Sequence, residues 1–397
     1  MVTGHKETDC LEDIREKFMS KYDNPMSRQV FSLPDLIETQ YDDLEEKARL
    51  VLSFQEIFNI QRIVLTGCGD SYAASLAAKP IFEMLTGIPT EVVTAIDLSR
   101  YYCEKHMGVD CRNPLVIAVS NSGTGARVAE AVQRARLHGC YVLGVTGNEK
   151  SPLGLHSDKI LKLNIPEFEG APGTRSYMVS VMSLLLLAIR FGEVRGSYTM
   201  DQAMDYRFDM RAQGEALRKL LPQMESTCVK AAEEWKDFPY YDFVGAGFDY
   251  AAAWFGWAKM LEATGKVAMH INSEEWFHLN FFARDARNLG TVVVGNTTNP
   301  GLSRTKEMVH YANVLKRPLL VVTDGTKEDF NGEEGTYVQV PAPKYPLNMP
   351  LTQFAPVCLL AGYISEMIGE KYGRGCEGDW SFAEGGAGVK NSEIIVK

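Results

Sequence analysis

Residues 63–74 read IVLTGCGDSYAA, and residues 242–252 read DFVGAGFDYAA. An offset of 178 residues aligns the two glycines of each stretch and the Tyr-Ala-Ala that follows them. The same offset, to within two residues, aligns VIAVSNS (116–122) with VVVGNTT (292–298). A chain that matches itself in nearly constant register is expected to consist of two copies of one structural unit.

In each half, short runs of β-branched residues alternate with longer stretches of helical periodicity. This alternation predicts βαβ units and a parallel sheet that helices cover on both faces. We expect an α/β protein with two doubly wound, flavodoxin-like, five-stranded domains in tandem, each an α/β/α sandwich. The expected strands are residues 62–67, 91–96, 114–120, 141–147 and 159–165 in the first half, and 241–247, 266–271, 291–296, 318–324 and 336–340 in the second.

The composition divides the chain further. Residues 200–236 are charged and favour helix, so we expect a helical connector between the halves. Residues 369–397 hold seven glycines, too many for a helix or strand, and we expect a tail that closes over a site in the protein. The expected segments are an N-terminal helical arm (1–50), a first, anion-binding domain (51–199), the connector (200–236), a second domain (237–368) and the tail (369–397).

Charge and hydropathy exclude several classes of partner. The 397 residues carry a formal charge of −10 without a stripe of Lys or Arg, so we expect no nucleic-acid partner. The longest apolar run, Met178 to Ile189, is shorter than the roughly 20 residues of a bilayer span, so we expect a core helix and no membrane partner. The N-terminus lacks the apolar region of a signal peptide, which predicts a cytoplasmic protein. The eight cysteines form no zinc-spaced cluster, so we expect reduced thiols, no metal and no other cofactor.

Two turns in the first half are suited to holding an anion. Residues 67–71 (Gly-Cys-Gly-Asp-Ser) and residues 120–124 (Ser-Asn-Ser-Gly-Thr) each follow a predicted strand and precede a predicted helix. In an open parallel sheet, ligands bind beyond the carboxyl ends of the strands, where helix N-termini offer free N–H groups. Neither turn completes the P-loop or the dinucleotide-binding motif, so we expect a phosphate ester. The alternative is that the Ser and Thr side chains merely cap the following helix.

These turns resemble those of the sugar isomerase (SIS) family, and the resemblance extends over about residues 45–397. It is greatest to the double-domain members related to the isomerase half of glucosamine-6-phosphate synthase and to fructosamine-6-phosphate deglycases. GCGDSY (67–72) resembles the family's Gly-Thr-Ser turn, SNSGTG (120–125) its Ser-Gln-Ser-Gly-x-Thr turn, and GTR (173–175) a Ser-Thr-Lys stretch that lines the sugar site. The substrate-binding residues that this resemblance implies are Gly69, Ser71, Ser120, Asn121, Ser122, Thr124, Thr174 and Arg175.

In the second half, AKMLEA (258–263) resembles the family's Lys-x-x-Glu motif, and EWFH (275–278) resembles its Glu-x-x-His motif. The 16 residues from Glu262 to His278 agree with the family spacing. In the family this His comes from the other subunit of a dimer, so we expect a homodimer or higher homo-oligomer with shared active sites. The resemblance implies three catalytic residues, Glu262, His278 and Lys390, and two more substrate-binding residues, Lys259 and Glu275.

The implied chemistry agrees with these residue types. Moving a carbonyl between C1 and C2 of a sugar needs a group that takes and returns one proton, which suits the carboxylate of Glu262. It also needs a group that opens the ring, which suits the imidazole of His278. On the helix that carries Lys259 and Glu262, we expect Trp254 and Trp257 to face the core and the two charged residues to share a face outside it. Without the resemblance, the pair is interpreted as a solvated ion pair, and His278 as a packed or capping histidine.

We therefore expect a phosphosugar isomerase that acts on a 6-phosphorylated ketose, aldose or amino sugar through an enediol or enediolamine. Deamination of an amino-sugar phosphate and deglycation of a fructosamine 6-phosphate are alternatives, as is a non-enzymatic sugar-phosphate sensor. No cysteine follows Met1, and the residues before the first domain are too few for a glutaminase domain, so we expect no glutamine-dependent amination.

Overall fold

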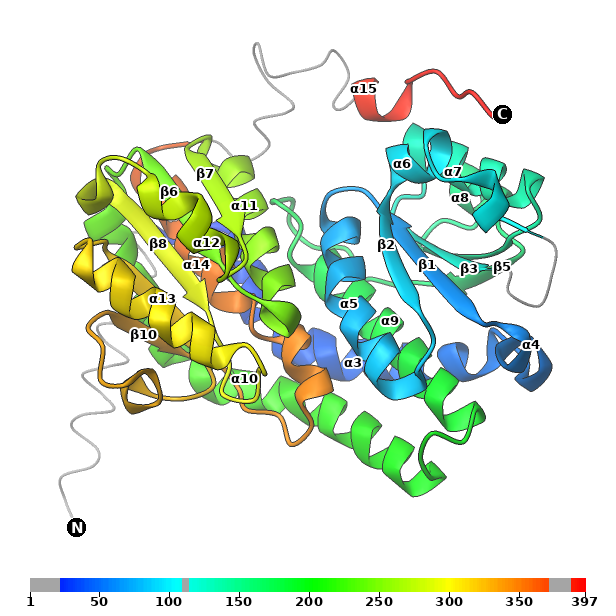
Figure 1. Cartoon of the computed structure of the whole chain (residues 1–397), viewed down its shortest axis with the longest axis horizontal. Coiled ribbons are helices and arrows are strands. Elements are labelled where there is room, and N and C mark those ends of the chain that lie inside the picture. The colour runs from blue at the N-terminus through cyan, green and yellow to red at the C-terminus, as the bar shows by residue number, and fades with distance from the viewer. Residues whose placement is uncertain (1–21, 109–113, 371–386) are drawn as a thin grey trace.

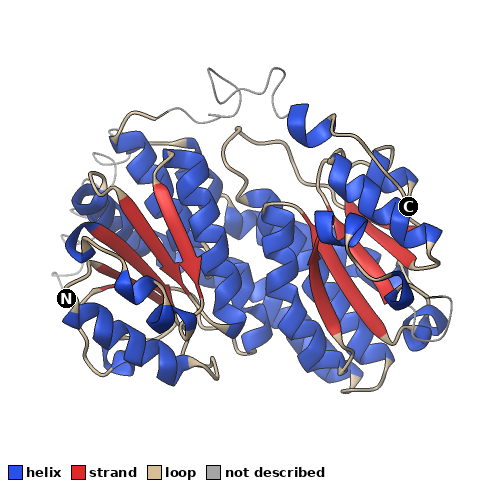
Figure 2. Cartoon of the chain, turned by 45° about the horizontal axis from the view of Figure 1, so that its top comes forward, coloured by secondary structure: helices blue, strands red, loops and turns tan. Residues whose placement is uncertain are grey.

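The computed structural model describes residues 22–108, 114–370 and 387–397, which form two parallel five-stranded sheets covered by helices (Figures 1 and 2). The strand orders are β2-β1-β3-β4-β5 and β7-β6-β8-β9-β10, so both sheets have the same topology. The expected α/β class with two doubly wound five-stranded domains is confirmed. The strands are β1 (Arg62–Gly67), β2 (Thr90–Thr94), β3 (Pro114–Val119), β4 (Tyr141–Thr146), β5 (Lys159–Lys162), β6 (Tyr240–Val244), β7 (Val267–Ile271), β8 (Leu289–Val294), β9 (Leu319–Thr323) and β10 (Thr336–Gln339).

Helices precede, cover and join the sheets. The α-helices are α2 (Pro25–Phe31), α3 (Leu33–Leu50), α4 (Phe54–Asn59), α5 (Asp70–Thr86), α6 (Ala95–Arg100), α7 (Ala126–Leu137), α8 (Pro152–Leu155), α9 (Arg175–Val194), α10 (Met200–Trp235), α11 (Tyr250–Thr264), α12 (Glu275–His278), α13 (Leu302–Val314), α14 (Ala355–Met367) and α15 (Ala387–Lys390). Short 3₁₀ helices are η1 (Glu104–His106), η2 (Gly247–Asp249), η3 (Asn280–Phe282), η4 (Ala286–Asn288), η5 (Lys327–Phe330) and η6 (Pro346–Leu351).

Each sheet separates two apolar clusters, because helices cover both of its faces. In β1, Ile63 packs in one cluster with α5 and α9, whereas the next residue, Val64, packs in another with α7. Successive side chains of a strand point to opposite faces, so a strand buried on both faces appears in the sequence as a continuous apolar run.

The glycines that mark the repeat have the same structural reason in both halves. A Cβ atom on Gly67 would lie 2.7 Å from an atom at the start of the following helix, and so would one on Gly245. Gly69 and Gly247 both have a positive φ, of 55° and 54°, which side chains other than glycine rarely adopt. The repeat in the sequence is therefore a repeated turn from strand to helix.

A long helix, α10, joins the two domains and occupies the range expected for the connector. It packs against α3 and α9 and also against α14 and β10, and it runs along the lower edge of both domains in Figure 1. Two helical segments, Arg175–Val194 and Pro346–Met367, are long and apolar enough to cross a bilayer, and both are buried inside the protein. The apolar run that begins at Met178 is confirmed as part of a core helix.

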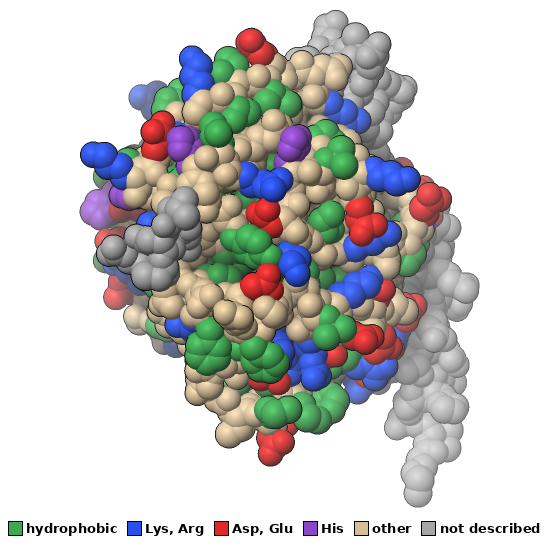
Figure 3. All heavy atoms as spheres, turned by 90° about the vertical axis from the view of Figure 1, so that its right-hand side faces the viewer, with side chains coloured by type: hydrophobic (Ala, Val, Ile, Leu, Met, Phe, Trp, Pro, Cys, Tyr) green, Lys and Arg blue, Asp and Glu red, His purple; other side chains and the backbone are tan. Residues whose placement is uncertain are grey.

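Surface charges of both signs are mixed on the face that Figure 3 shows, where Lys and Arg side chains alternate with Asp and Glu. On α10, Arg218 pairs with Asp35 at 3.0 Å and with Glu38 at 3.2 Å. Exposed pairs of this kind contribute about 0–1 kcal/mol each to stability. The mixture on this face gives it no continuous basic stripe.

Candidate active site

The interface between the two domains brings Lys259, Glu262 and Asp70 together. The helices α5 and α11 each follow the first strand of their sheet, and they lie side by side between the two sheets (Figure 1). Lys259 Nζ lies 2.7 Å from Glu262 Oε2 on the same helix and 2.7 Å from Oδ1 of Asp70, which follows Gly69, the N-cap of α5. Lys259 is fully buried, whereas 44% of the Glu262 side chain is exposed. The Glu262 carboxylate is thus held by a buried ammonium and remains open to a ligand.

The charges at this interface determine the protonation of each group. Burial alone would lower the pKa of Lys259, but the carboxylates of Asp70 and Glu262 outweigh it, so the pKa is raised and the ammonium stays protonated. Burial raises the pKa of Glu262 above its ordinary value against the opposing charge of Lys259, and Asp70 adds to the rise. A carboxyl group with a raised pKa is suited to taking and returning a proton near neutral pH.

The orientation expected for α11 is wrong. Lys259 is fully buried, whereas Trp254 and Trp257, which we expected in the core, are only partly buried. The reason is long-range packing: α11 lies between α5 of the first domain and α14, so the face that carries Lys259 is in the interior. Lys259 Nζ also lies 4.8 Å from the centre of the Phe255 ring, a cation–π contact that helps to offset the lost hydration.

The turn after β3 keeps its hydroxyl groups within the turn. Ser120 Oγ accepts a hydrogen bond from the N–H of Gly123 at 3.1 Å, and the hydroxyls of Ser122 and Thr124 lie 3.1 Å apart. The N-cap of α7 is Gly125, and among the described residues no side chain caps this helix. The capping alternative is therefore wrong for α7, and the N-terminus of this helix, which has no side-chain cap, is suited to an anion.

Asn121 ties this turn to the end of β4. Its backbone carbonyl oxygen accepts hydrogen bonds from the N–H of Gly147 at 2.9 Å and from the hydroxyl of Thr146 at 3.2 Å. An open hollow of about 530 Å³ lies beside the turn. It is lined by Asn121, Gly147, Asn148, Leu163, Asn164, Ile165 and Pro166. A hollow at the carboxyl ends of the strands is where open α/β sheets bind ligands.

The other residues predicted to bind substrate in the first domain differ in accessibility. Ser71 is half-buried in the first turn of α5. Thr174 is fully buried, and its N–H donates to Gln29 Oε1 at 3.2 Å. The guanidinium of Arg175 is also buried and donates to the hydroxyl of Ser32 at 2.6 Å. In this conformation Thr174 and Arg175 hold the N-terminal helices against the first domain.

His278 lies in the second domain and has a partner there. Its side chain is 63% exposed, and Nε2 lies 3.2 Å from Glu274 Oε1, a carboxylate that Arg304 also binds. Glu275 begins the same short helix, and its N–H donates to Asn272 Oδ1 at 2.8 Å. Within the described part of one chain, no hydrogen bond or ion pair joins His278 to the carboxylate on α11. The exposed imidazole is accessible to a second copy of the chain, and a shared site stays a prediction.

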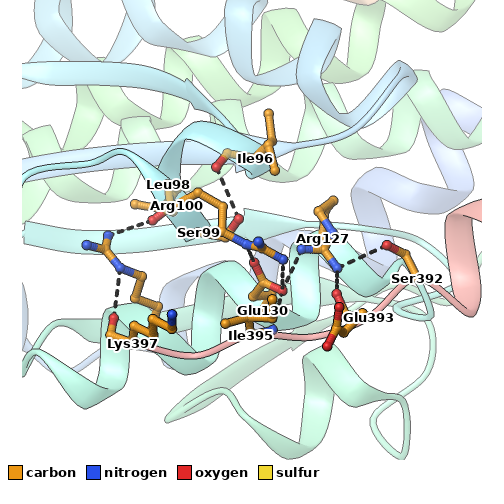
Figure 4. A network of polar contacts seen from close by, with 11 residues as sticks. Ile96, Leu98, Ser99, Arg100, Arg127, Glu130, Ser392, Glu393, Ile395 and Lys397 are labelled. Atoms are coloured by element: carbon orange, nitrogen blue, oxygen red, sulfur yellow. Dashed lines mark hydrogen bonds and ion pairs between the residues drawn. The ribbon is translucent and has the colours of Figure 1, made fainter.

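The C-terminal residues lie on α7 of the first domain (Figure 4). Glu130 accepts from the N–H of Ile395 at 2.7 Å, and Arg127 binds both Glu130 and the tail. Burial alone would raise the pKa of Glu130, but neighbouring arginines and this N–H hold it at about 2, so the carboxylate stays charged. Lys390 is exposed on α15, which contacts α7, the helix that follows the turn at residues 120–124. The tail that we expect to close over the site falls partly on residues 371–386, which lie outside the described residues.

In the second domain, the turn that corresponds to residues 67–71 carries a carboxylate, that of Asp249. At the offset of 178 residues, Asp249 occupies the position that Ser71 has in the first half. This carboxylate accepts hydrogen bonds from the backbone N–H of Asn296 at 3.0 Å and from the side-chain amide of Asn299 at 2.7 Å. Both donors lie in the turn that corresponds to residues 120–124. The first domain is therefore the better candidate for binding an anion. Neither Asp70 nor Asp249 is among the predicted site residues, although an acidic residue just after a Gly-x-Gly turn is visible in the sequence.

Comparisons with known proteins agree with this architecture. Residues 56–190 match the model of the SIS domain family. The glutamine–fructose-6-phosphate aminotransferase (isomerizing) of Gloeobacter violaceus is 27% identical over 228 residues, which are 57% of this chain and 37% of that protein. A protein of the same description from Arabidopsis thaliana is 23% identical over 371 residues, which are 90% of this chain and 53% of that protein. The chain thus spans about half the length of these relatives or less.

Solved structures share the fold of most of the chain. The C-terminal domain of glucosamine-fructose-6-phosphate aminotransferase from Francisella tularensis matches with a TM-score of 0.79 at 18% identity, over 89% of this chain and 98% of that one. The tagatose-6-phosphate ketose/aldose isomerase of Escherichia coli matches with a TM-score of 0.69 at 16% identity, over 87% of this chain and 95% of that one. The two domains together therefore have the fold of these structures. Residues 56–190, the part that matches the SIS domain model, lie within the first of these two domains.

Proposed function

We propose that the chain is a phosphosugar isomerase that acts on a 6-phosphorylated ketose, aldose or amino sugar. The sequence relatives are named for fructose 6-phosphate, and one of the similar structures is named for tagatose 6-phosphate, which supports a sugar phosphate as the ligand. The observation that carries the proposal is the placement of Glu262. Its accessible carboxylate is held by the buried ammonium of Lys259, which also contacts Asp70 in the anion-binding turn of the first domain.

In this proposal the phosphate binds at Ser71 and the turn at 120–124, where hydroxyls and two helix N-termini stabilise its charge. Glu262 takes a proton from the carbon next to the carbonyl and returns it to the neighbouring carbon, through an enediol or enediolamine. His278 of the partner subunit protonates and deprotonates the ring oxygen. Lys259, which we expected to touch the substrate, is fully buried, so in this proposal it holds the carboxylate of the base instead.

Exchange with solvent deuterium tests the proposal. The protein is incubated with a panel of 6-phosphorylated ketoses, aldoses and amino sugars in D₂O, and proton NMR follows the signals at C1 and C2. We expect exchange with at least one sugar, and we expect Glu262→Gln to slow it by about a hundredfold or more while the sugar still binds. Glu233→Gln, which changes an exposed glutamate on α10, is the matched control. An unchanged exchange rate in Glu262→Gln would contradict the role of this residue.

Deglycation of a fructosamine 6-phosphate is the second candidate, and the charge at the interface favours it. Asp70 and Glu262 carry two negative charges against the single positive charge of Lys259, and a net negative site attracts a substrate amine. Adding glycated amino acid 6-phosphates to the panel tests this chemistry, because cleavage releases a free amine. Sugar-phosphate binding without turnover of any substrate, unaffected by Glu262→Gln, would instead identify a sensor.

A further inference from the structure

Asp70 connects the anion-binding end of the first domain to the base proposed for the second. It is the first residue of α5, and its Oδ1 lies 2.7 Å from Lys259 Nζ. Because Lys259 is fully buried, its ammonium has lost its hydration shell, and the carboxylates of Asp70 and Glu262, each at 2.7 Å, replace that water. The position of the ammonium is therefore determined from both domains.

We infer that Asp70 is a positioning residue for the proposed base. By drawing the ammonium of Lys259 toward α5, Asp70 divides that charge between two carboxylates. Glu262 is then a stronger base than an exclusive ion pair with Lys259 would leave it. Asp70 acts through Lys259 and not by contact with the reacting carbons. This inference rests on the proposed role of Glu262.

The groups that face Glu262 support this division of charge. Lys259 lies on the same helix, Asp70 comes from α5, and Cys358 comes from α14. Burial raises the pKa of Glu262, Lys259 opposes the rise, and the like charge of Asp70 adds to it. Burial also raises the pKa of the Cys358 thiol to about 12, so this group is neutral near pH 7 and adds no charge. Among these groups, Asp70 is thus the one whose charge opposes the effect of the Lys259 ammonium on the pKa of Glu262.

A glycine supplies the room that Asp70 needs. A Cβ atom on Gly173, just before α9, would lie 2.6 Å from Asp70 Oδ2 and 3.0 Å from the hydroxyl of Ser176. Such an approach to Asp70 Oδ2 is well inside van der Waals contact, so a side chain at position 173 would displace the carboxylate from its place against Lys259. The residue at position 173 therefore controls where the Asp70 carboxylate can lie, so a substitution at Gly173 tests the role of Asp70 without changing its charge.

Titration of Glu262 tests the inference directly. Protein labelled with ¹³C at the glutamate carboxyl carbons is titrated by NMR, and Glu262→Gln identifies the signal. In Asp70→Asn we expect the midpoint for Glu262 to move to lower pH, because Lys259 then pairs with Glu262 alone. The acid limb of kcat/KM should move in the same direction, with kcat reduced more than KM is changed. Asp201→Asn, which changes an exposed carboxylate in the first turn of α10, is the matched control and should leave both unchanged.

A double-mutant cycle tests the geometry. Gly173→Ala keeps every charge but should lower the Glu262 midpoint by displacing Asp70, and it serves as the second variant if Asp70→Asn does not fold. In Asp70→Ser the smaller side chain leaves room, so adding Gly173→Ala should shift the midpoint no further. An unchanged Glu262 midpoint in both Asp70→Asn and Gly173→Ala would overturn the inference. Fully additive shifts of Asp70→Ser and Gly173→Ala in the cycle would also overturn it. The predicted shifts without turnover of any sugar phosphate would refute the proposed function and leave the charge coupling of Asp70 standing.

Discussion

Replacing Arg317 with methionine should destabilise the second domain much more than the loss of a surface ion pair. Arg317 NH1 lies 2.9 Å from Oδ2 of Asp242, and both side chains are fully buried. Asp242 also accepts hydrogen bonds from Trp276 Nε1 at 3.0 Å and from Asn280 Nδ2 at 2.7 Å. These two residues lie on either side of His278 in the chain. The ion pair therefore anchors the segment that carries the predicted ring-opening group.

The structure sets the size and the pH dependence of this effect. Removing one partner of a buried ion pair costs about 3–5 kcal/mol, because a buried charge is left uncompensated. Burial already raises the pKa of Asp242 against the opposing charge of Arg317, so without the arginine the carboxyl is protonated more readily. A raised pKa in the folded state gives stability that is present below the unfolded pKa and is lost as the pH rises through the folded pKa. The penalty in Arg317→Met should therefore be larger at about pH 8 than at about pH 5.

Urea unfolding followed by circular dichroism at these two pH values measures the penalty. Arg218→Met, which removes an exposed arginine paired with surface carboxylates, is the control and should cost about 0–1 kcal/mol. The double variant Arg317→Met/Asp242→Asn removes both charges and keeps an amide oxygen for Trp276, so it should recover much of the loss. A loss below about 1 kcal/mol at both pH values, or a larger loss at acid pH, would refute the reasoning.

Three further predictions concern the two turns and the tail. Ser122→Ala should weaken the binding of inorganic phosphate by about tenfold, the loss of one hydrogen bond to a charged group, and calorimetry would show an unchanged Kd if the turn binds no anion. Burial raises the pKa of Asp249 to about 6, so the stability that this group contributes should fall as the pH rises from about 4 to 6; urea unfolding of Asp249→Asn should lack this component, and an identical pH profile would contradict it. Glu130→Gln should release the C-terminal segment, seen as faster hydrogen exchange at Ile395, and in the unmodified chain the stability from Glu130 should be lost only as the pH falls from about 4.5 towards 2. Equal exchange rates at Ile395 would show that Glu130 does not hold the tail.

The two sheets could be predicted because their strands are continuous apolar runs and the turns after them repeat. The ends of β1 agree with the predicted range, Arg62–Gly67, since a charged residue and a tightly packed glycine bound the run. The strand predicted at 159–165 ends instead at Lys162. Its partner β4 ends at Thr146, which pairs with Lys162, so later residues have no strand to pair with. Strand ends therefore depend on the neighbouring strand, which the local sequence does not contain.

The site was less predictable than the fold because its contacts join distant elements. The motif that contains Lys259 and Glu262 located the helix, but the apolar pattern of that helix placed Trp254 and Trp257 in the core instead of the lysine. The pattern of one helix does not show which neighbour covers it, and here α5 covers the charged face. The role that we infer for Asp70 could not be predicted for the same reason, since its partner lies in the other half of the chain.

The turn from the first strand to the first helix is the same in both halves, but the side chains in it differ. In the first half this turn holds the half-buried Ser71, whereas in the second half the same position holds Asp249, whose carboxylate accepts a hydrogen bond from the N–H of Asn296. The preceding residue also differs, because Asp70 of the first half corresponds to Phe248 of the second, and Asp70 reaches Lys259 across the interface. Binding an anion and holding a base next to it place opposite demands on local charge. A duplicated chain can meet both demands by assigning the turns with hydroxyl side chains to one copy and the proposed carboxylate base to the other, with α5 and α11 in contact where the two meet.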